Sequence, residues 1–538
     1  MTHRNREKKL VVRRFGMGFN GQMQNSHSRR VFLSGLCASV AAGPSVAMPM
    51  ERSLRPVLRP DGFGKKTIPS ADSIVSSAKL DGHVAFSVFD ARTGEKLEGG
   101  EARRGSPPAS VAKAITALYG LETLGAGYQF ETTLIATGPI KNGVLKGDLV
   151  LSGGGDPTLD TDGLGALVDS LTAAGVKTVE GAFIVSDGLF PRTHTIDADQ
   201  PDQVGYSPAV SGIALNFNRV HFEWRRASGK YNITMQARTE RYRPNVFMAK
   251  MRLSERRGPV YEYKDTGKWD EWSVARSALG GSGSRWLPVR KPALYAGDVF
   301  QTLARSKGIE LKAPKVVRAK PSGTVIARHK SGQLIDVLKD MLRYSTNLTA
   351  EMVGLAASVK RAGAMPSLKA SAAEMSRWAE QRLGAVDTQL VDHSGLGSHS
   401  RMTADGMASA LVRVHQSGTL RPILKPFGMR DAQGRPQNDH PVKVDAKTGT
   451  LNFVSGLAGY VTAQDGRIMA FAIFAVDPAR RARVERANRE SPPGARSWNR
   501  RAKNMQQKLI ERWDALYGDV TSASADQKDE ATQPASSL

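Results

Sequence analysis

A serine and a lysine three residues apart stand at the start of an apolar segment, and this stretch constrains the fold more than any other. Ser110 and Lys113 belong to the run Pro-Pro-Ala-Ser-Val-Ala-Lys, and apolar residues recur at helical spacing from Ala114 to Leu124. The spacing puts both side chains on one face of a helix, one turn apart. A helix N-terminus favours negative charge on the serine oxygen, and a desolvated lysine can accept the hydroxyl proton. The pair is a candidate nucleophile and general base of an acyl-transfer enzyme.

A serine at a helix start is also an ordinary N-cap residue, so this motif alone does not decide the matter. Two later motifs add weight. Ser345 and Asn347 form a Ser-x-Asn that opens a predicted helix, although Ser345 could equally be a cap. The sole Lys-Thr-Gly of the chain, at 447–449, leads into a strand that we predict over 451–463, and Asp465-Gly466 predicts a hairpin turn after it.

Composition limits the class of protein. The chain of 538 residues has room for several domains and a large core. Its formal charge of +25 favours contact with an anionic cell wall or membrane surface, yet no nucleic-acid module is recognisable, so we expect no nucleic-acid partner. Cys37 is the single cysteine, and it lies in a leader segment, which leaves the rest of the chain without disulfides or thiolate metal sites.

The first 47 residues have the pattern of a twin-arginine export signal. A basic segment leads to Arg29-Arg30, a modest apolar run reaches Gly43, and Ala47 ends a small-x-small cleavage site. The apolar run is too short for a transmembrane anchor, and no later segment is long and apolar enough. We therefore expect a periplasmic protein without a membrane anchor.

The remaining pattern predicts mixed secondary structure. From 178 to 324 it favours short strands, and the polar tail 518–538 is expected to be disordered. Helices are predicted over 160–175, 332–343, 345–362, 368–383, 403–416 and 498–517.

The order Ser-x-x-Lys, Ser-x-Asn, Lys-Thr-Gly is the signature of penicillin-recognising serine acyltransferases. More narrowly, the chain resembles the class C low-molecular-mass penicillin-binding proteins, the D-alanyl-D-alanine carboxypeptidase/endopeptidase family. The further marks are Gly-Gly-Asp-Pro-Thr-Leu at 154–159, Ala350-Glu351, Asp392-x-Ser394-Gly395-Leu396 and the long gap between the first two motifs.

The resemblance implies an α+β fold, in which an antiparallel sheet flanked by helices is interrupted by a large β-rich insertion. It places the catalytic domain in two parts, 65–134 and 325–517, around an inserted region over 135–324. The implied function is a periplasmic serine D,D-peptidase, which cleaves D-Ala-D-Ala termini and cross-links of peptidoglycan stem peptides and is inhibited by β-lactams. No cofactor is implied.

The resemblance also implies a role for each motif residue. Ser110 attacks the carbonyl between two D-amino acids while Lys113 takes its proton, Ser345 relays a proton to the leaving amine close to Lys447, and Asn347 holds the substrate amide. The implied substrate-binding residues are Thr448, Gly449 and Thr450, with Asp156 reaching the amino group of the substrate's diamino acid. Backbone N–H groups of Ser110 and Thr450 would form the oxyanion hole.

Some features depart from the family pattern or leave alternatives open. The family often continues Ser-Gly-Leu-Ser-Arg, but here Gly397 and Ser398 follow Leu396, and Arg401 is out of register. No metal-ligand spacing is found among the histidines, so no metal site is predicted. A β-lactamase-like hydrolase and a non-catalytic peptidoglycan-binding protein are the alternative functions. The role of the Arg-rich stretch 480–501 stays open.

Overall fold

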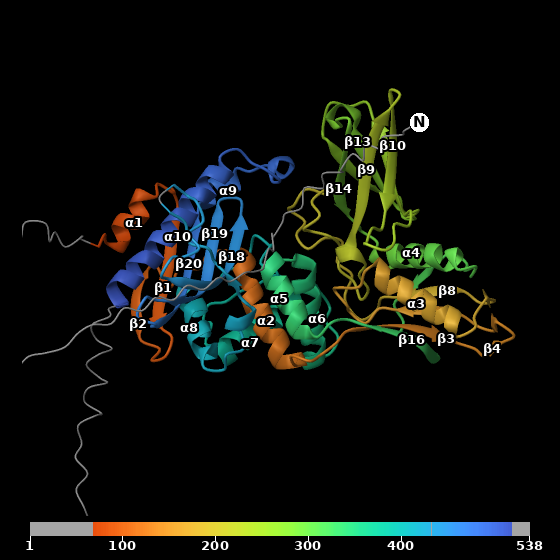
Figure 1. The fold of residues 1–538 in the computed structure, drawn as a ribbon, viewed down its shortest axis with the longest axis horizontal. Helices are drawn as coiled ribbons and strands as arrows, with labels where there is room; N and C mark the ends of the chain where they lie inside the picture. Colours follow the sequence, from red (N-terminus) through yellow and green to blue (C-terminus); the bar gives the residue numbers. More distant parts are fainter. Residues whose placement is uncertain (1–67, 432, 519–538) are drawn as a thin grey trace, which may run out of the picture. The chain divides into compact units, whose positions relative to one another are not determined.

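A computed structural model describes residues 68–431 and 433–518, which belong to one compact unit beginning at Lys66 (Figure 1). The predicted export signal with Cys37, and the predicted tail beyond Gly518, lie outside the described residues. Within the described part, no helix is both long and apolar enough to cross a membrane.

One six-stranded antiparallel sheet draws its strands from both ends of the described chain (Figure 1). Its order is β17-β18-β19-β20-β1-β2, so a strand from near residue 90 pairs with one from near residue 470. The strands are β1 (His83–Asp90), β2 (Lys96–Gly100), β17 (Lys425–Pro426), β18 (Lys443–Leu451), β19 (Val454–Thr462) and β20 (Ile468–Val476). The resemblance implied this split antiparallel sheet, and the structure confirms it.

Strand β20 shows why the sheet is covered on both faces. Side chains alternate across a strand, and here Phe471 and Ile473 pack on the face that carries Trp513, whereas Ala470 and Ala472 belong to the core around the helices of the other face. Both sets are fully buried, which explains a sequence without polar alternation. Small residues on one face let helices lie close to the sheet.

The helices form two groups (Figure 1). On the face with Trp513 lie α1 (Ala71–Ser77) and α10 (Ala495–Tyr517). The other core contains α2 (Ala112–Leu124), α5 (Leu334–Tyr344), α6 (Asn347–Ala362), α7 (Leu368–Leu383) and α8 (Ala404–His415). These bounds agree closely with the helices predicted after residue 330.

The inserted region, proposed from sequence as 135–324, has its own sheet and core. The sheet order is β15-β8-β6-β3-β16, mixing parallel and antiparallel pairs. Its strands are β3 (Glu131–Ala136), β6 (Leu149–Ser152), β8 (Phe183–Ser186), β15 (Lys315–Val317) and β16 (Thr324–Lys330). Helices α3 (Thr161–Ala173) and α4 (Pro292–Ser306) pack against it (Figure 1).

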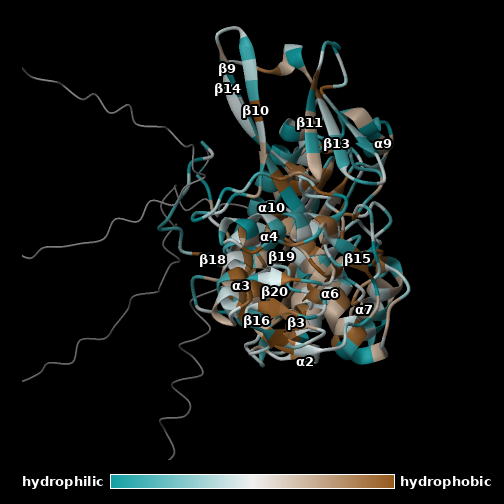
Figure 2. Cartoon of the chain, turned by 90° about the vertical axis from the view of Figure 1, so that its right-hand side faces the viewer, coloured by the Kyte–Doolittle hydropathy of each residue, from teal (hydrophilic) through white to brown (hydrophobic). Residues whose placement is uncertain are grey.

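Smaller sheets complete the inserted region. One combines β4 (Ile140–Lys141), β5 (Val144–Leu145) and β7 (Thr178–Val179). Two three-stranded sheets contain β9 (Arg219–Ala227), β10 (Lys230–Gln236), β14 (Ser282–Pro288), β11 (Ala249–Ser254), β12 (Tyr261–Asp265) and β13 (Asp270–Ala275). Strands β9, β10 and β14 are largely hydrophilic, in contrast to the brown core around β20 and β3 (Figure 2).

Two details of the sequence prediction are wrong. Helix α4 lies in a stretch predicted as short strands; Pro292 starts it and Gly297 falls inside it, where a Cβ would come within 2.7 Å of Pro314. Close packing therefore requires glycine at this position, and because glycine disfavours helices, its presence argued against predicting one. The Lys-Thr-Gly motif lies inside β18 rather than before a strand, and the turn falls at Asn452 and Phe453, whose φ is +57°.

Candidate active site

Ser110 lies at the entrance of α2, in the 3₁₀ turn η1 (Ala109–Val111). Neither η1 nor α2 has a side-chain hydrogen bond at its N-cap, so the capping explanation for Ser110 is wrong. Its Oγ instead accepts a hydrogen bond from Lys113 Nζ at 2.9 Å. The serine also lines a cavity of about 620 Å³, which gives a substrate access to it.

Lys113 is fully buried and its ammonium has three hydrogen-bond acceptors. They are Ser110 Oγ at 2.9 Å, Asn347 Oδ1 at 2.7 Å and the carbonyl oxygen of Ser394 at 2.8 Å. Burial lowers the pKa of Lys113 to about 8. Two of the three partners can only accept, so the lone pair of the neutral amine must face the Ser110 hydroxyl, the one partner able to donate.

Two buried carboxylates support the loop that binds Lys113. Glu351 accepts hydrogen bonds from the backbone N–H groups of His393 and Ser394 at 2.8 and 3.0 Å. Asp392 accepts two more from the same loop. Burial raises the pKa of both carboxyls, that of Glu351 to about 8. Where they are ionised, their negative charges raise the pKa of Lys113 and so oppose the larger effect of burial. The sequence analysis noted Glu351 and Asp392 only as marks of the family. Their closeness along the chain to the serine-containing motifs was the signal that could have identified them as part of the site.

Ser345 and Lys447 form a second serine–lysine pair. Ser345 follows α5 with φ +59°, and the N-cap of α6 is Thr346, which makes no side-chain capping bond, so Ser345 is not the cap of that helix. Lys447 Nζ donates to Ser345 Oγ at 3.0 Å and to the Thr448 carbonyl at 2.7 Å. Burial and the nearby charge of Lys113 lower the pKa of Lys447 to about 7.

Strand β18 offers an open edge beside these pairs. Its partner β17 reaches only Asp445 and Ala446, so within the described residues no strand covers this edge from Lys447 onward. Thr448 and Thr450 are exposed there. An extended peptide can add to such an edge through backbone hydrogen bonds.

Two glycines allow the motifs to meet. A Cβ on Gly449 would lie 2.8 Å from the Pro108 carbonyl oxygen and 3.0 Å from Ser110 N, so only glycine lets β18 approach η1 this closely. A Cβ on Gly395, which has φ +75°, would lie 1.9 Å from the Ala109 carbonyl oxygen. The site thus depends on backbone contact among three distant segments.

The structure brings most of the sequence-predicted site residues together. Ser110, Ser345, Asn347 and Thr450 line the cavity, and the two buried lysines contact them. Arg401, judged out of register in the sequence, also lines it.

Asp156 is the exception among the predicted residues. It is buried after β6, where its Oδ1 accepts hydrogen bonds from the Thr158 N–H and hydroxyl groups at 2.8 and 2.7 Å. Burial raises its pKa. Asp156 is not among the residues that line the cavity, so its predicted contact with substrate stays a prediction. Over the described ranges no cluster of three His, Cys, Asp or Glu side chains could hold a metal ion.

Four features together define the class of protein. They are a split antiparallel sheet, a serine–lysine pair at a helix entrance, a second pair at an open strand edge and an inserted domain. This combination is that of a penicillin-recognising serine enzyme. Comparison with known families places the chain within that class. The D-Ala-D-Ala carboxypeptidase 3 (S13) family matches residues 70–491, and the chain belongs to this family. It is a serine D,D-peptidase acting on peptidoglycan.

Individual relatives agree with this assignment. The D-alanyl-D-alanine carboxypeptidase of Actinomadura sp. (strain R39) is 28% identical over 473 residues, covering 79% of this chain and 86% of that protein. DacB of Haemophilus influenzae is 26% identical over 388 residues, covering 68% and 79%. The solved structure of penicillin binding protein 4 from Haemophilus influenzae has a TM-score of 0.67 at 20% identity and covers 82% of this chain and 99% of its own, which supports the fold.

Proposed function

We propose that Ser110 is the acyl-accepting nucleophile of this D,D-peptidase and that Lys113 is its general base. The hydrogen bond between Lys113 Nζ and Ser110 Oγ supports this proposal, because the amine lone pair has no other partner that can give it a proton. Ser110 Oγ bonds to the carbonyl carbon of the penultimate D-residue, and its proton passes to Lys113.

The oxyanion that forms needs two donors. We assign them to the backbone N–H groups of Ser110 and Thr450, since both residues line the cavity and Gly449 lets β18 approach η1 closely. The terminal carboxylate of the substrate binds Lys447, Thr448 and Thr450 at the open edge of β18.

Collapse of the tetrahedral intermediate requires a proton for the leaving amine. We assign the relay to Ser345, whose Oγ accepts a hydrogen bond from Lys447. With a pKa of about 7, Lys447 can pass a proton to Ser345 near neutral pH while Ser345 donates its own to the amine. Asn347 bridges toward Lys113 through Oδ1, and its amide nitrogen donates to the Tyr206 carbonyl at 2.9 Å, which leaves one N–H for a carbonyl oxygen of the substrate.

Water then releases the acyl group from Ser110. The same steps apply to a terminal D-Ala and to a D,D-cross-link, so we propose both carboxypeptidase and endopeptidase activity. A β-lactam follows the first step and leaves its acyl group on Ser110, because its leaving amine stays tethered.

The test is intact-protein mass spectrometry of the purified protein with and without benzylpenicillin, beside a Ser110→Ala variant. We expect a mass increase equal to one benzylpenicillin on the wild type and none on the variant. Consumption of the drug without an adduct would indicate rapid deacylation and a β-lactamase-like activity. An adduct on Ser110→Ala would contradict the proposed nucleophile.

We also infer periplasmic localisation through twin-arginine export. The Arg29-Arg30 run, the short apolar segment and the small residues before Ala47 support it. The N-terminus of the protein recovered from periplasm should begin at Met48, and the precursor should accumulate in cells lacking twin-arginine translocation. Export that continues in such cells would contradict this route.

A further inference from the structure

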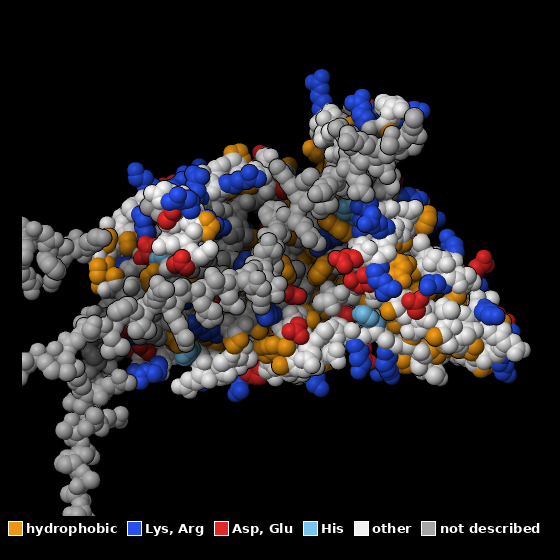
Figure 3. Space-filling model, viewed as in Figure 1, with side chains coloured by type: hydrophobic (Ala, Val, Ile, Leu, Met, Phe, Trp, Pro, Cys, Tyr) orange, Lys and Arg blue, Asp and Glu red, His pale blue; other side chains and the backbone are white. Residues whose placement is uncertain are grey.

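Three cationic side chains, apart from histidine, are buried in the described part of the chain: Lys113, Lys447 and Arg290. The two lysines belong to the catalytic site, whereas Figure 3 shows many other Lys and Arg side chains at the surface. Within the described residues no carboxylate forms an ion pair with the Arg290 guanidinium; burial lowers its pKa, and the more distant carboxylates of Asp202 and Asp270 oppose this effect. A buried charge is costly unless it is hydrogen-bonded, so the partners of Arg290 indicate its role.

The guanidinium of Arg290 binds one loop of the inserted region, over 193–210. Arg290 itself lies between β14 and α4. Its Nη1 donates to the carbonyl oxygens of His194 and Ser207 at 3.1 and 2.7 Å, and its Nη2 donates to that of Asp202 at 2.8 Å. The loop contains no helix or strand whose hydrogen bonds could fix its shape. Charge-assisted hydrogen bonds from one rigid, planar group therefore hold distant points of this loop together.

The same loop supplies the acceptor that orients Asn347. Asn347 Nδ2 donates to the Tyr206 carbonyl oxygen at 2.9 Å, and Asn347 Oδ1 accepts from Lys113 Nζ at 2.7 Å. Tyr206 directly precedes Ser207 in the chain. Because a carbonyl oxygen can only accept, the Tyr206 carbonyl selects the amide orientation in which the oxygen faces Lys113. A flipped amide would direct an N–H donor at the lone pair of the neutral lysine, in competition with the Ser110 hydroxyl.

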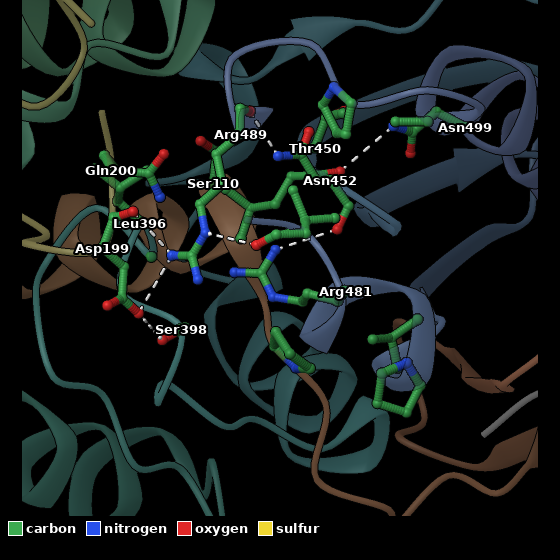
Figure 4. Close-up of a pocket in the computed structure, with 18 of the residues that line it drawn as sticks. Ser110, Asp199, Gln200, Leu396, Ser398, Thr450, Asn452, Arg481, Arg489 and Asn499 are labelled. Atoms are coloured by element: carbon green, nitrogen blue, oxygen red, sulfur yellow. Dashed lines mark hydrogen bonds and ion pairs between the residues drawn. The ribbon is translucent and has the colours of Figure 1, made fainter. Parts of the chain in front are cut away.

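A second set of contacts joins the loop to the catalytic part. Asp199 accepts a hydrogen bond from Ser398 Oγ at 3.2 Å and forms an ion pair with Arg489 at 3.3 Å (Figure 4). Arg489 and Arg481 lie in one wall of the cavity. The side chains of the ion pair are partly exposed, at 26% and 49%, so solvent weakens it. We therefore expect the buried guanidinium of Arg290 to be the stronger constraint on the loop.

We propose that Arg290 is a positioning residue for the acylation of Ser110 and that it acts through Asn347. Arg290 holds the loop so that the Tyr206 carbonyl meets the Asn347 amide. The amide oxygen then faces Lys113, and the lone pair of the neutral lysine is left to the Ser110 hydroxyl. The inserted region thus contributes to the orientation of the base without contacting the reacting atoms. This inference rests on the proposed roles of Ser110 and Lys113.

The test is a double-mutant cycle that combines Arg290→Met with Asn347→Ala. Acylation by benzylpenicillin is followed by intact-protein mass spectrometry. With Asn347 present, we expect Arg290→Met to lower the acylation rate constant by about 10- to 100-fold, the size of effect that misplacing a group of the site produces. In Asn347→Ala the same change should have an effect of less than about twofold, because no amide is left to orient. Equal losses in both backgrounds, or no loss in Arg290→Met alone, would overturn the proposal.

The pH dependence of acylation gives a readout that a loss of stability would not move. Protonated Lys113 donates to Asn347 Oδ1, and the loss of this acceptor disfavours the protonated form. In Arg290→Met the pH profile should therefore move to lower pH while its maximum falls. A lower maximum with an unmoved profile would contradict a change in the orientation of the amide.

Controls separate the positioning effect from unfolding. Thermal unfolding shows whether each variant is folded; if Arg290→Met is not, the cycle is run with Arg290→Lys, which keeps the buried charge but lacks the planar fork, so a smaller loss confined to the background with Asn347 is expected. Arg486→Gln is the matched control, because Arg486 also contacts the loop, at Asp202, but from a half-exposed position; its acylation should be unchanged.

The outcomes also separate this inference from the proposed function. An adduct on the wild type together with equal losses in both backgrounds would reject the role of Arg290 and leave the proposed nucleophile and base intact. If the wild type forms no adduct and leaves the drug untouched, the proposed function fails and this inference fails with it.

Discussion

Two regions of the cavity, its floor with the catalytic lysine and its wall with the arginines, differ in how their charged side chains are paired. On the floor, Lys113 is buried with three hydrogen bonds, and two buried carboxylates lie close enough to affect its pKa. On the wall, Arg481 forms no ion pair within the described residues, although the more distant carboxylates of Asp197 and Asp199 raise its pKa. A closed network fixes reacting groups in one geometry, whereas an unmatched charge can discriminate among ligands. The lysine on the floor is therefore held in one geometry, whereas the arginine of the wall stays open to whatever occupies the cavity.

The largest effect should come from removing the base on the floor. Lys113→Ala takes away the proton acceptor of Ser110, so we expect acylation by benzylpenicillin to slow by about 10³-fold or more. The rate is measured by the time course of the penicilloyl adduct in intact-protein mass spectrometry. A variant that reacts within tenfold of the wild type, a margin of about 1.4 kcal/mol, would show that another group is the base.

The next largest effect should come from disturbing the close backbone contact between Gly395 and Ala109. In Gly395→Ala the new Cβ would meet the Ala109 carbonyl at 1.9 Å, so we expect the free energy of unfolding to fall by about 3 kcal/mol or more. Gly308→Ala is the matched control, since Gly308 also has positive φ, +79°, but open space around its Cβ; we expect a loss of about 1–2 kcal/mol there. Denaturant unfolding measures both. Equal losses would show that the close contact adds nothing.

A smaller effect should appear in the pH dependence of acylation. Lys113 acts as a base only when neutral, and the proposed relay needs a protonated Lys447. The rate should therefore rise from acid pH, pass through a maximum between about 7 and 8, where the pKa values of Lys447 and Lys113 lie, and then fall. Burial raises the pKa of Glu351 itself to about 8, so Glu351→Gln removes a negative charge, and thereby lowers the pKa of Lys113, chiefly in the upper part of this range; any shift of the profile should be to lower pH. Stopped-flow acylation from pH 5.5 to 9.5, a span of about four units around the expected pKa, tests both statements. A limb that moves to higher pH would contradict the assigned charge effect.

The smallest effect is expected at a partly exposed ion pair outside the cavity. Arg486 Nη2 lies 2.7 Å from Asp202 Oδ1, and both side chains are about half exposed, at 49% and 43%. Solvent screens such a pair, so Arg486→Gln should change the free energy of unfolding by less than about 1 kcal/mol and leave benzylpenicillin acylation unchanged. A larger loss in denaturant unfolding would mean that this contact between the C-terminal segment and the inserted region is a major source of stability.

The sequence by itself determined much of the catalytic part. The bounds of α7 and the ends of α2 and α6 followed from apolar periodicity, since this signal depends on neighbouring residues. Local patterns could not reveal α4, because Gly297 is required by packing against Pro314 rather than by helix preference. The turn at Asn452 was missed because Phe453 adopts positive φ, and phenylalanine is not a residue that predicts this conformation.

Tertiary structure alone decided how the motifs meet and what surrounds them. The pairing of β1 with β20, the clearance at Gly395 and the carboxylates near Lys113 all join segments hundreds of residues apart, and no local pattern encodes such contacts. The sequence named the residues that can carry the chemistry, since their types and spacing reflect the reaction. The fold decided which charges are buried, which are paired and which, such as that of Arg481, form no ion pair within the described residues, because burial and pairing depend on distance in space.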